Sequence, residues 1–488
     1  MIQPPTDAER SRALGDLRYF VELSRERGEL EVIEGADPYL EMGALYELSL
    51  RDTYPPLLLF RNIKGHAPDY EVLMNVRFSR VFVGDLDMQA VKDRRAAGKW
   101  EAKPVPPHVV ETGPICENII RGDDVRVTQF PAGTWHAGDG GPYIGTDCLV
   151  INKDPDSDWT NVGTYRVQVH GDRELTVFFE PGKHGRVIRD RYWAKGEPCP
   201  VVVVVGQAPA LGDAAALSSR YGVSELESAG SLIGRAVDVV YGEVTGLPIP
   251  ADAEMAFEGF ILPPDVDSRI EGPFAEWTGY YATAPHKEAV MRVDRVYHRN
   301  APMLCAQPPT KPTFPGRQTY IGWIAALWDA IEAAGVPGVT GVWKMLGGGA
   351  RFINVIAIKQ MHEGHAKMAG LVATGAGPGA FLGRITIVVD DDIDITSNAE
   401  VMWALATRWD PRTQTDIIDG CWSGNLDPVL SPAQRAADEM VNSRIIIYAV
   451  KPFAWKDRFP AVNTVDVTYS REVEAKWHDK LAFLRDRA

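Results

Sequence analysis

The chain has 488 residues and a formal net charge of −15, from 51 basic and 66 acidic side chains. This charge disfavours a nucleic-acid backbone or an anionic membrane as the main partner, because both repel negative charge. Hydrophobic residues make up 45% of the chain and charged residues 24%, which is typical of a globular protein and excludes the disordered and fibrous classes. At this length we expect two or three domains.

The five cysteines are widely spaced and form no C-x-x-C pair, and their odd number cannot be bridged completely within one chain. This usage favours a reducing compartment. The N-terminus has no basic region followed by an apolar run, and no stretch reaches about 18 apolar residues. The sequence therefore predicts a soluble, cytoplasmic protein that binds neither membrane nor nucleic acid.

The pattern of apolar residues predicts an α/β (α+β) protein. Residues 1–110 are expected to form an N-terminal α/β unit, with a helix at 17–27 and a buried strand at 57–60. A basic, polar stretch at 92–103 is followed by PVPP and predicts a linker.

The central region, 111–310, has short apolar strands separated by Gly, Pro and Asp, without long helices. That density of strands indicates an antiparallel barrel or sandwich, and we expect the chemistry to lie there. The predicted strands are 148–152, 164–169, 175–179, 201–205, 237–240, 255–261 and 289–296.

After a linker at 311–325, the chain is expected to form a C-terminal α/β domain at 326–450 and a tail at 451–488. The tail has a charged helix near 472–485 and is expected to dock on another domain or subunit. The remaining predicted helices are 320–334, 399–409 and 432–441, and the strands are 352–358, 385–389 and 445–450.

Two carboxylates, Glu271 and Glu276, lie within the six residues EGPFAE, and Arg166 lies about a hundred residues earlier, at the end of NVGTYR. An arginine beside an acid pair keeps one carboxylate ionised while the other titrates, which suits proton transfer on an organic acid. The alternative is an exposed turn with two ordinary acids. The WTGYY that follows Glu276 favours a desolvated, aromatic pocket wall, in which one glutamate would have a raised pKa.

A second candidate set is Asn161, His184 and Glu225. One amide oxygen, one imidazole and one carboxylate suit a divalent ion such as Mn²⁺ or Mg²⁺ better than Zn²⁺. No local spacing links the three residues, and a lone histidine is more often structural.

Three further motifs resemble known binding or catalytic motifs but do not match them. GAGPGA at 375–380 follows a helix-like segment instead of a strand, HEGH at 362–365 is one residue short of the zincin spacing, and DDDID at 390–394 lacks the glycine and distal glutamate of an EF-hand loop.

Several segments, in order along nearly the whole chain, resemble the UbiD family of reversible decarboxylases. They are EGPFAEWTGYY from Glu271, the N-x-x-x-x-R segment from Asn161 to Arg166, PGKH ending at His184, GVSE ending at Glu225, and the strand and helix at 385–411. The EGPF-x-E segment is the most specific of them.

The resemblance implies prenylated FMN as the cofactor, supplied by a flavin prenyltransferase. It also implies a split β-barrel of flavin-reductase type at 111–310, between the N-terminal unit and a C-terminal oligomerisation domain. A divalent metal, Mn²⁺ or Mg²⁺, would join the cofactor phosphate to Asn161, His184 and Glu225, with K⁺ nearby. A homodimer, or an assembly of dimers, is the expected oligomer.

By the same resemblance, Arg166 would bind the substrate carboxylate, Glu271 would stay ionised and orient Arg166, and Glu276 would carry the proton. The reaction would be reversible, non-oxidative decarboxylation through a covalent cofactor adduct. Further residues expected at the cofactor are Gly163, Thr164, Tyr165, Lys183 and, for the phosphate in place of the family's usual lysine, Arg384.

The aromatic residues Trp277, Tyr280 and Tyr281 favour a flat aromatic or heteroaromatic acid, and the resemblance leans toward a hydroxybenzoate such as protocatechuate. Lys311, Arg317 or Arg351 would read a ring substituent. Cinnamic-type acids are an alternative substrate class. A flavin-binding protein without decarboxylase activity and an NADH-dependent flavin reductase are alternative functions.

Overall fold

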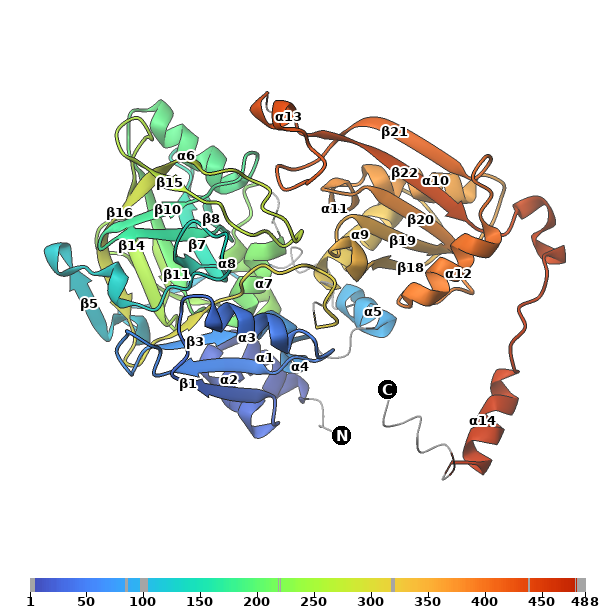
Figure 1. Cartoon of the computed structure of the whole chain (residues 1–488), viewed down its shortest axis with the longest axis horizontal. Helices are drawn as coiled ribbons and strands as arrows, with labels where there is room; N and C mark the ends of the chain where they lie inside the picture. The colour runs from blue at the N-terminus through green and yellow to red at the C-terminus, as the bar shows by residue number, and fades with distance from the viewer. Residues whose placement is uncertain are drawn as a thin grey trace.

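The computed structural model describes residues 5–83, 87–96, 104–217, 219, 221–316, 321–437, 439–478 and 480. Within these ranges the strands form four sheets, and Figure 1 shows them in two bodies joined through α5 and the segment before α9. The mixed α/β class is confirmed. The predicted domain boundaries and the split barrel stay predictions.

The N-terminal sheet has the order β1-β2-β3-β17, so a strand from residues 303–305 returns to complete it. Helix α2 buries Phe20 and Leu23 and begins where the sequence predicts. Basic residues 92–96 continue a helix, so the linker prediction is wrong there, and 97–103 lie outside the described residues. The elements are α1 Asp7–Gly15, α2 Leu17–Glu26, β1 Leu30–Glu34, α3 Glu41–Ser49, β2 Leu57–Arg61, β3 Glu71–Met74, α4 Arg80–Val83 and α5 Met88–Ala96.

The central sheet is built on β11, whose run CPVVVVV is almost wholly buried between β14 and β7. A continuous apolar run of this kind is typical of a strand covered on both faces. The helices α6, α7 and α8 come from this part of the chain (Figure 1). The elements are β4 His108–Val109, β5 Asn118–Arg121, β6 Tyr143–Gly145, β7 Cys148–Lys153, β8 Thr160–Gly163, β9 Val167–Gly171, β10 Glu174–Val177, α6 His184–Ala194, β11 Cys199–Val205, α7 Pro209–Leu217, α8 Glu225–Ile233, β12 Asp238–Tyr241, β13 Pro248–Pro250, β14 Met255–Ile261, β15 Ser268–Glu271, β16 His286–His298 and β17 Met303–Cys305.

The described strands of this sheet follow the order β6-β9-β10-β16-β14-β11-β7-β8, with β5 and β15 also on β16. The small sheet β13-β12-β4 lies apart from it. The predicted strand at 164–169 begins three residues late, at Val167, and the irregular residues before it carry Arg166. This shift places the arginine in a connection and not within the ladder.

The C-terminal sheet has the order β18-β19-β20-β22-β21. The helix predicted at 432–441 ends at Ala436, and the chain has returned to a strand by Val441. The tail carries its helix away from this sheet (Figure 1). The elements are α9 Ile321–Ala333, β18 Val339–Lys344, β19 Ile353–Ile358, α10 His365–Gly375, α11 Gly377–Ala380, β20 Ile385–Asp390, α12 Asn398–Arg408, β21 Thr415–Trp422, α13 Pro432–Ala436, β22 Val441–Ala449 and α14 Val467–Lys476.

Helix α5 packs on α9 of the C-terminal body although it follows the N-terminal sheet in sequence. Arg95 donates to Asp329 at 2.9 Å and to Glu332 at 2.5 Å, and its guanidinium lies 4.2 Å from the centre of the Trp328 ring. Through helix α5, the N-terminal part of the chain therefore contacts the C-terminal body (Figure 1). Across the described residues, no helix is long and apolar enough to span a membrane.

Candidate active site

Arg166 is the centre of a buried charged cluster. It lies in the connection between β8 and β9, and its side chain is 6% exposed. Glu271 is the last residue of β15, and Glu276 lies in the loop that follows. The structure thus brings together the three predicted catalytic residues from positions more than a hundred residues apart.

Arg166 binds Glu271 through two parallel hydrogen bonds. Its Nε donates to Oε1 at 2.8 Å and its Nη2 to Oε2 at 2.7 Å. Nη1 donates to Oε1 of Glu276, and Nη2 also donates to Oγ1 of Thr283 at 3.2 Å. Because a guanidinium has five N–H donors, one donor on Nη1 remains for an anionic ligand.

The two glutamates have different surroundings. Oε1 of Glu271 also accepts from the hydroxyl of Tyr143 at 3.0 Å. The carboxyl group of Glu276 bonds only to Arg166 among the residues described. Burial raises the pKa of Glu276 to about 7, with Glu180 and Glu271 adding to the rise and Arg166 opposing it. Glu276 can therefore gain or lose a proton near neutral pH.

Burial alone would lower the pKa of Arg166, but its hydrogen bond to Glu271 and the charges of both glutamates raise that pKa above its ordinary value. Arg166 therefore stays charged throughout the working pH range. Its guanidinium carbon lies 4.0 Å from the ring centre of Phe178 and 5.3 Å from that of Phe274. These rings exclude water from one side of the cluster, which strengthens its charge interactions.

The loop from Gly272 to Glu276 is fixed by a second loop. Gly140 N donates to Pro273 O at 2.7 Å, and Ala275 N donates to Oδ1 of Asp139 at 3.1 Å. Gly272 has a φ of +77°, which favours glycine. A Cβ on Gly140 would lie 2.1 Å from the carbonyl oxygen of Gly272, so the close approach of the loops requires glycine there.

The predicted aromatic wall is only partly correct. Tyr280 and Tyr281 are 62% and 45% exposed, so they do not desolvate the acids. Trp277 packs instead toward the C-terminal body, 5.8 Å from the ring centre of Phe352. The rings beside Arg166 are those of Phe178 and Phe274, which the sequence analysis did not assign to the site. The position of Phe274 inside the EGPF motif was the sequence feature that could have indicated its place beside Arg166.

Asn161 and Glu225, two of the predicted metal ligands, are both 2% exposed. Asn161 is on β8 opposite Asn152, and its Nδ2 donates to Oδ1 of Asn152 at 3.0 Å, which leaves its own Oδ1 as a ligand atom. Glu225 begins α8, and its Oε2 accepts from the backbone of Val162 at 2.8 Å.

His184, the third predicted ligand, begins α6 and has its ring centre 5.2 Å from that of Trp159. The indole of Trp159 donates to Val223 O at 3.1 Å, two residues before Glu225. Trp159 therefore contacts both His184 and the segment that leads into Glu225. These contacts place the three ligands around the same end of β8.

The donor set fits a divalent cation. Burial raises the pKa of Glu225 to about 7, and no described cation forms a salt bridge with this carboxylate. Burial and the neighbouring Lys183 lower the pKa of His184, so its imidazole is neutral and able to bind a metal. No cluster of three or more His, Cys, Asp or Glu in the described chain is placed to hold a metal ion, so a site here would depend on the amide oxygen of Asn161 as well. An amide oxygen with one imidazole and one carboxylate suits Mn²⁺ or Mg²⁺.

The other residues expected at the cofactor lie around this corner. Gly163 ends β8, and Thr164 is exposed. The hydroxyl of Tyr165 accepts from Gly185 N at 3.2 Å, so its ring lies against the start of α6. Lys183 directly precedes that helix.

Two cations, Lys183 and Arg351, lie near Glu180, whose charge also acts on Glu276. Lys183 lies 4.9 Å from the ring centre of Phe381, and Arg351 lies 3.2 Å from that of Trp323. Burial lowers the pKa of Arg351 to about 9, with Glu180 opposing the shift, and it also lowers the pKa of Lys183. Neither cation forms a salt bridge with a carboxylate of the described chain, so the pair would favour an anion.

The structure gives less support to other predicted residues. Arg384 donates to Oδ1 of the buried Asp427 at 2.5 Å, which engages part of its guanidinium. Lys311 is exposed. Arg317 lies outside the described residues.

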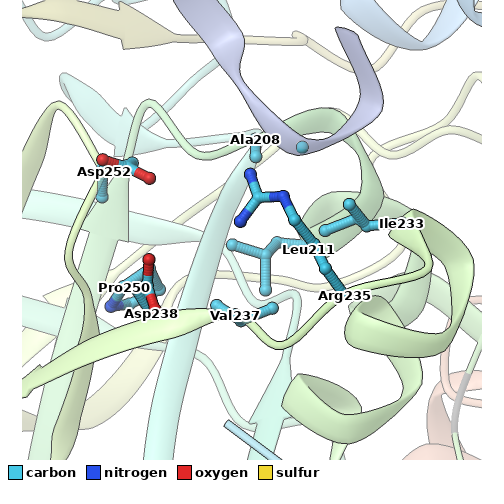
Figure 2. A pocket seen from close by; sticks show the side chains of 10 residues that line it. Ala208, Leu211, Ile233, Arg235, Val237, Asp238, Pro250 and Asp252 are labelled. Atoms are coloured by element: carbon cyan, nitrogen blue, oxygen red, sulfur yellow. The ribbon is translucent and has the colours of Figure 1, made fainter. Parts of the chain in front are cut away.

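A separate small pocket lies between the turn joining α1 to α2 and the end of α8 (Figure 2). Its walls include the apolar Leu211, Ile233 and Val237, and the charged side chains of Arg235, Asp238 and Asp252 also line it. None of the predicted site residues lines it.

Known families and proteins were compared with the chain. Three family models match: the 3-octaprenyl-4-hydroxybenzoate carboxy-lyase N-terminal domain at residues 21–83, the Rift-related domain at 108–312 and the C-terminal domain at 322–449. The phenolic acid decarboxylase of Streptomyces sp. (strain D7) is 30% identical over 461 residues, covering 91% of this chain and 93% of that protein. The pyrrole-2-carboxylic acid decarboxylase of Pseudomonas aeruginosa is 28% identical, covering 96% and 99% of the two chains.

Among solved structures, the UbiD-class enzyme HmfF from Pelotomaculum thermopropionicum in complex with FMN superposes with a TM-score of 0.79. It is 29% identical, with 93% of this chain and 98% of that chain covered. An evolved dimeric form of HmfF was solved with prenylated FMN. The chain belongs to the UbiD family of carboxy-lyases, as the sequence motifs predicted.

Proposed function

We propose that the protein catalyses the reversible, non-oxidative decarboxylation of an aromatic or heteroaromatic carboxylic acid. The observation that carries this proposal is the buried Arg166, which is held by two glutamates, together with the burial that raises the pKa of Glu276 to about 7. One cation to bind a carboxylate and one acid to exchange a proton are the two protein groups that the reaction needs.

In this proposal the remaining N–H of Arg166 binds the substrate carboxylate, and Glu271 fixes the plane of the guanidinium. Loss of CO₂ breaks the bond between the ring carbon and the carboxyl carbon. Glu276 then gives its proton to that ring carbon to form the new C–H bond, and the reverse reaction returns the proton to Glu276. Phe178 and Phe274 keep water from competing as the proton donor.

Prenylated FMN, when bound, would supply the electron sink for the negative charge left by CO₂. Asn161, His184 and Glu225 would hold a divalent ion, Mn²⁺ or Mg²⁺, beside its phosphate, with K⁺ nearby. The uncompensated carboxylate of Glu225 and the neutral imidazole of His184 support this role. A flavin prenyltransferase would supply the cofactor, and a homodimer is the proposed assembly.

We further propose a flat, ring-substituted acid such as a hydroxybenzoate as the substrate. The relatives named for phenolic acid and pyrrole-2-carboxylic acid support a single aromatic ring. Arg351 and Lys183 would attract an oxygen substituent on that ring, because the one carboxylate whose charge acts on both of them, that of Glu180, forms no salt bridge with either among the described residues.

The test is co-expression with a flavin prenyltransferase, anaerobic purification, mass spectrometry of the released cofactor and metal analysis. The purified protein is then given benzoic, hydroxybenzoic, pyrrole-carboxylic and cinnamic acids, and CO₂ release is measured. We expect prenylated FMN with Mn²⁺ and turnover of at least one single-ring acid. A loaded protein that releases no CO₂ from any of them would overturn the proposal.

A further inference from the structure

His286 is a half-buried neighbour of the catalytic pair, with its side chain 33% exposed, and the proposed mechanism does not use it. It is the first residue of β16 and lies directly opposite Glu271 in the antiparallel ladder with β15. Side chains at directly opposed positions project from the same face of a sheet. The strand register therefore places this imidazole beside the glutamate that orients Arg166.

The ring lies between two carboxylates. Its Nε2 is 3.5 Å from Oε2 of Glu288 and 3.8 Å from Oε2 of Glu271. Both glutamates are buried, with exposed fractions of 7% and 0%. Two buried carboxylates at these distances from one nitrogen favour a positive charge on the ring.

The other ring nitrogen decides the protonation state. Nδ1 lies 3.2 Å from the carbonyl oxygen of Ala284, and a carbonyl only accepts, so Nδ1 carries a hydrogen. A neutral ring would then present the lone pair of Nε2 to two carboxylates. A second proton on Nε2 replaces that repulsion with attraction, and the close approach of Glu288 accordingly raises the pKa of His286.

Other charges around the ring are consistent with this state. Arg166 forms a salt bridge with Glu271, and Arg189 of α6 donates to Oε1 of Glu288 at 3.2 Å. Phe178 covers the ring, with the two ring centres 5.3 Å apart. Each glutamate therefore has one arginine of its own, and the imidazolium lies between the two pairs.

We infer that His286 is a positioning residue whose imidazolium places a positive charge beside Glu271, so that Glu276, and not Glu271, carries the exchangeable proton of the active site. The inference rests on the proposed function and deepens it. Glu271 accepts from Arg166 and Tyr143 and faces His286, whereas Glu276 has Arg166 alone. This asymmetry suits the two acids to different roles: Glu271 orients Arg166, and Glu276 transfers the proton.

The activity test compares His286→Asn and His286→Arg with the wild type. Asparagine keeps a donor for the carbonyl of Ala284 but removes the positive charge beside Glu271. We expect the acidic limb of kcat/KM against pH to move upward by about one unit in His286→Asn, which is about tenfold at a pH on that limb. The limb should return toward its wild-type position in His286→Arg.

His298→Asn is the matched control, because it changes the histidine at the other end of the same strand, 12 positions away in sequence and bonded to Arg299 O. His298→Asn should leave the acidic limb of kcat/KM against pH at its wild-type position. A limb that stays at the wild-type pH in His286→Asn, or that moves equally in His298→Asn, would overturn the inference.

The charge on His286 can be measured without turnover. In ¹⁵N-histidine NMR of the wild-type protein loaded with plain FMN, the signal absent from His286→Asn should show both nitrogens protonated at pH 7. A neutral ring at that pH overturns the inference whatever the kinetics of the variants show. This measurement is independent of CO₂ release, so failure of the proposed decarboxylation and failure of the His286 assignment are distinguishable.

Discussion

The Arg166 cluster and the Asn161, His184 and Glu225 set are both buried and polar, but they differ in charge balance. Arg166 has two carboxylates and a network of hydrogen bonds from the protein. Glu225 has a backbone N–H and no described cation. A buried carboxylate without a cation is costly, so the second set is incomplete until a cation binds. The difference teaches that the polypeptide alone completes the charge balance of the proposed proton-transfer site, whereas the proposed metal site still needs a cation.

The largest expected effect is at the complete site. Glu276→Gln removes the proton donor but keeps the volume and an acceptor for Arg166, so turnover should fall by roughly 10³-fold, within the usual range for a general acid. Flavin content should not change. Single-turnover CO₂ release and the flavin absorption spectrum measure these two quantities.

The control for this variant is Glu197→Gln, because Glu197 is an exposed glutamate of the central region. It should retain wild-type turnover. Activity above a tenth of wild type in Glu276→Gln would contradict the assigned role.

The next effect concerns the incomplete site. Adding Mn²⁺ to the metal-free protein should raise its melting temperature, because binding to the folded state alone adds about 2.7 kcal/mol at a hundredfold excess over Kd. Glu225→Gln should lose most of this gain. Glu227→Gln, which changes the other acid in the first turn of α8, is the matched control and should keep it. Equal Mn²⁺ shifts in both variants would show that the metal binds elsewhere.

A smaller effect follows from the raised pKa of Glu225. The folded protein holds this proton up to about pH 7, whereas the unfolded chain releases it near 4.5, so stability falls as pH rises between these values. Without metal, Glu225→Gln should gain melting temperature relative to wild type at pH 8 and not at pH 4.5. The stability of the variant relative to wild type should differ between these two pH values by on the order of 1 to 3 kcal/mol in the free energy of unfolding. Scanning fluorimetry with a chelator measures it, and parallel pH curves would rule out a buried, uncompensated Glu225.

The smallest effect concerns the cations between the bodies. Arg351→Met should raise KM about tenfold for acids with an oxygen substituent, the loss expected for one charge-assisted hydrogen bond. KM for the unsubstituted ring should change little. Steady-state kinetics on matched acids measures this, with the exposed Arg412→Met as the control. A loss of flavin in Arg351→Met would assign Arg351 to the cofactor phosphate instead.

Several features were predictable because they depend on local pattern. The apolar run in β11, the helix α2 and the alternation of helices and strands after residue 320 follow from side-chain periodicity. The EGPF-x-E motif brought Glu271 and Glu276 together because both lie on one short segment. The linker at 92–103 was mispredicted because part of this polar segment is a helix stabilised by contacts with α9.

By itself, the sequence determined which chemical groups are present, their order and the family to which the chain belongs. Tertiary structure decided which of those groups meet: the register of β15 on β16 set Glu271 beside His286, and the late start of β9 turned Arg166 toward both glutamates. It also decided their protonation, since the same side chain has a pKa near 4.5 in water and about 7 when buried, as for Glu276. Burial and partner geometry arise from contacts between residues far apart in the chain, and a local sequence pattern does not contain them.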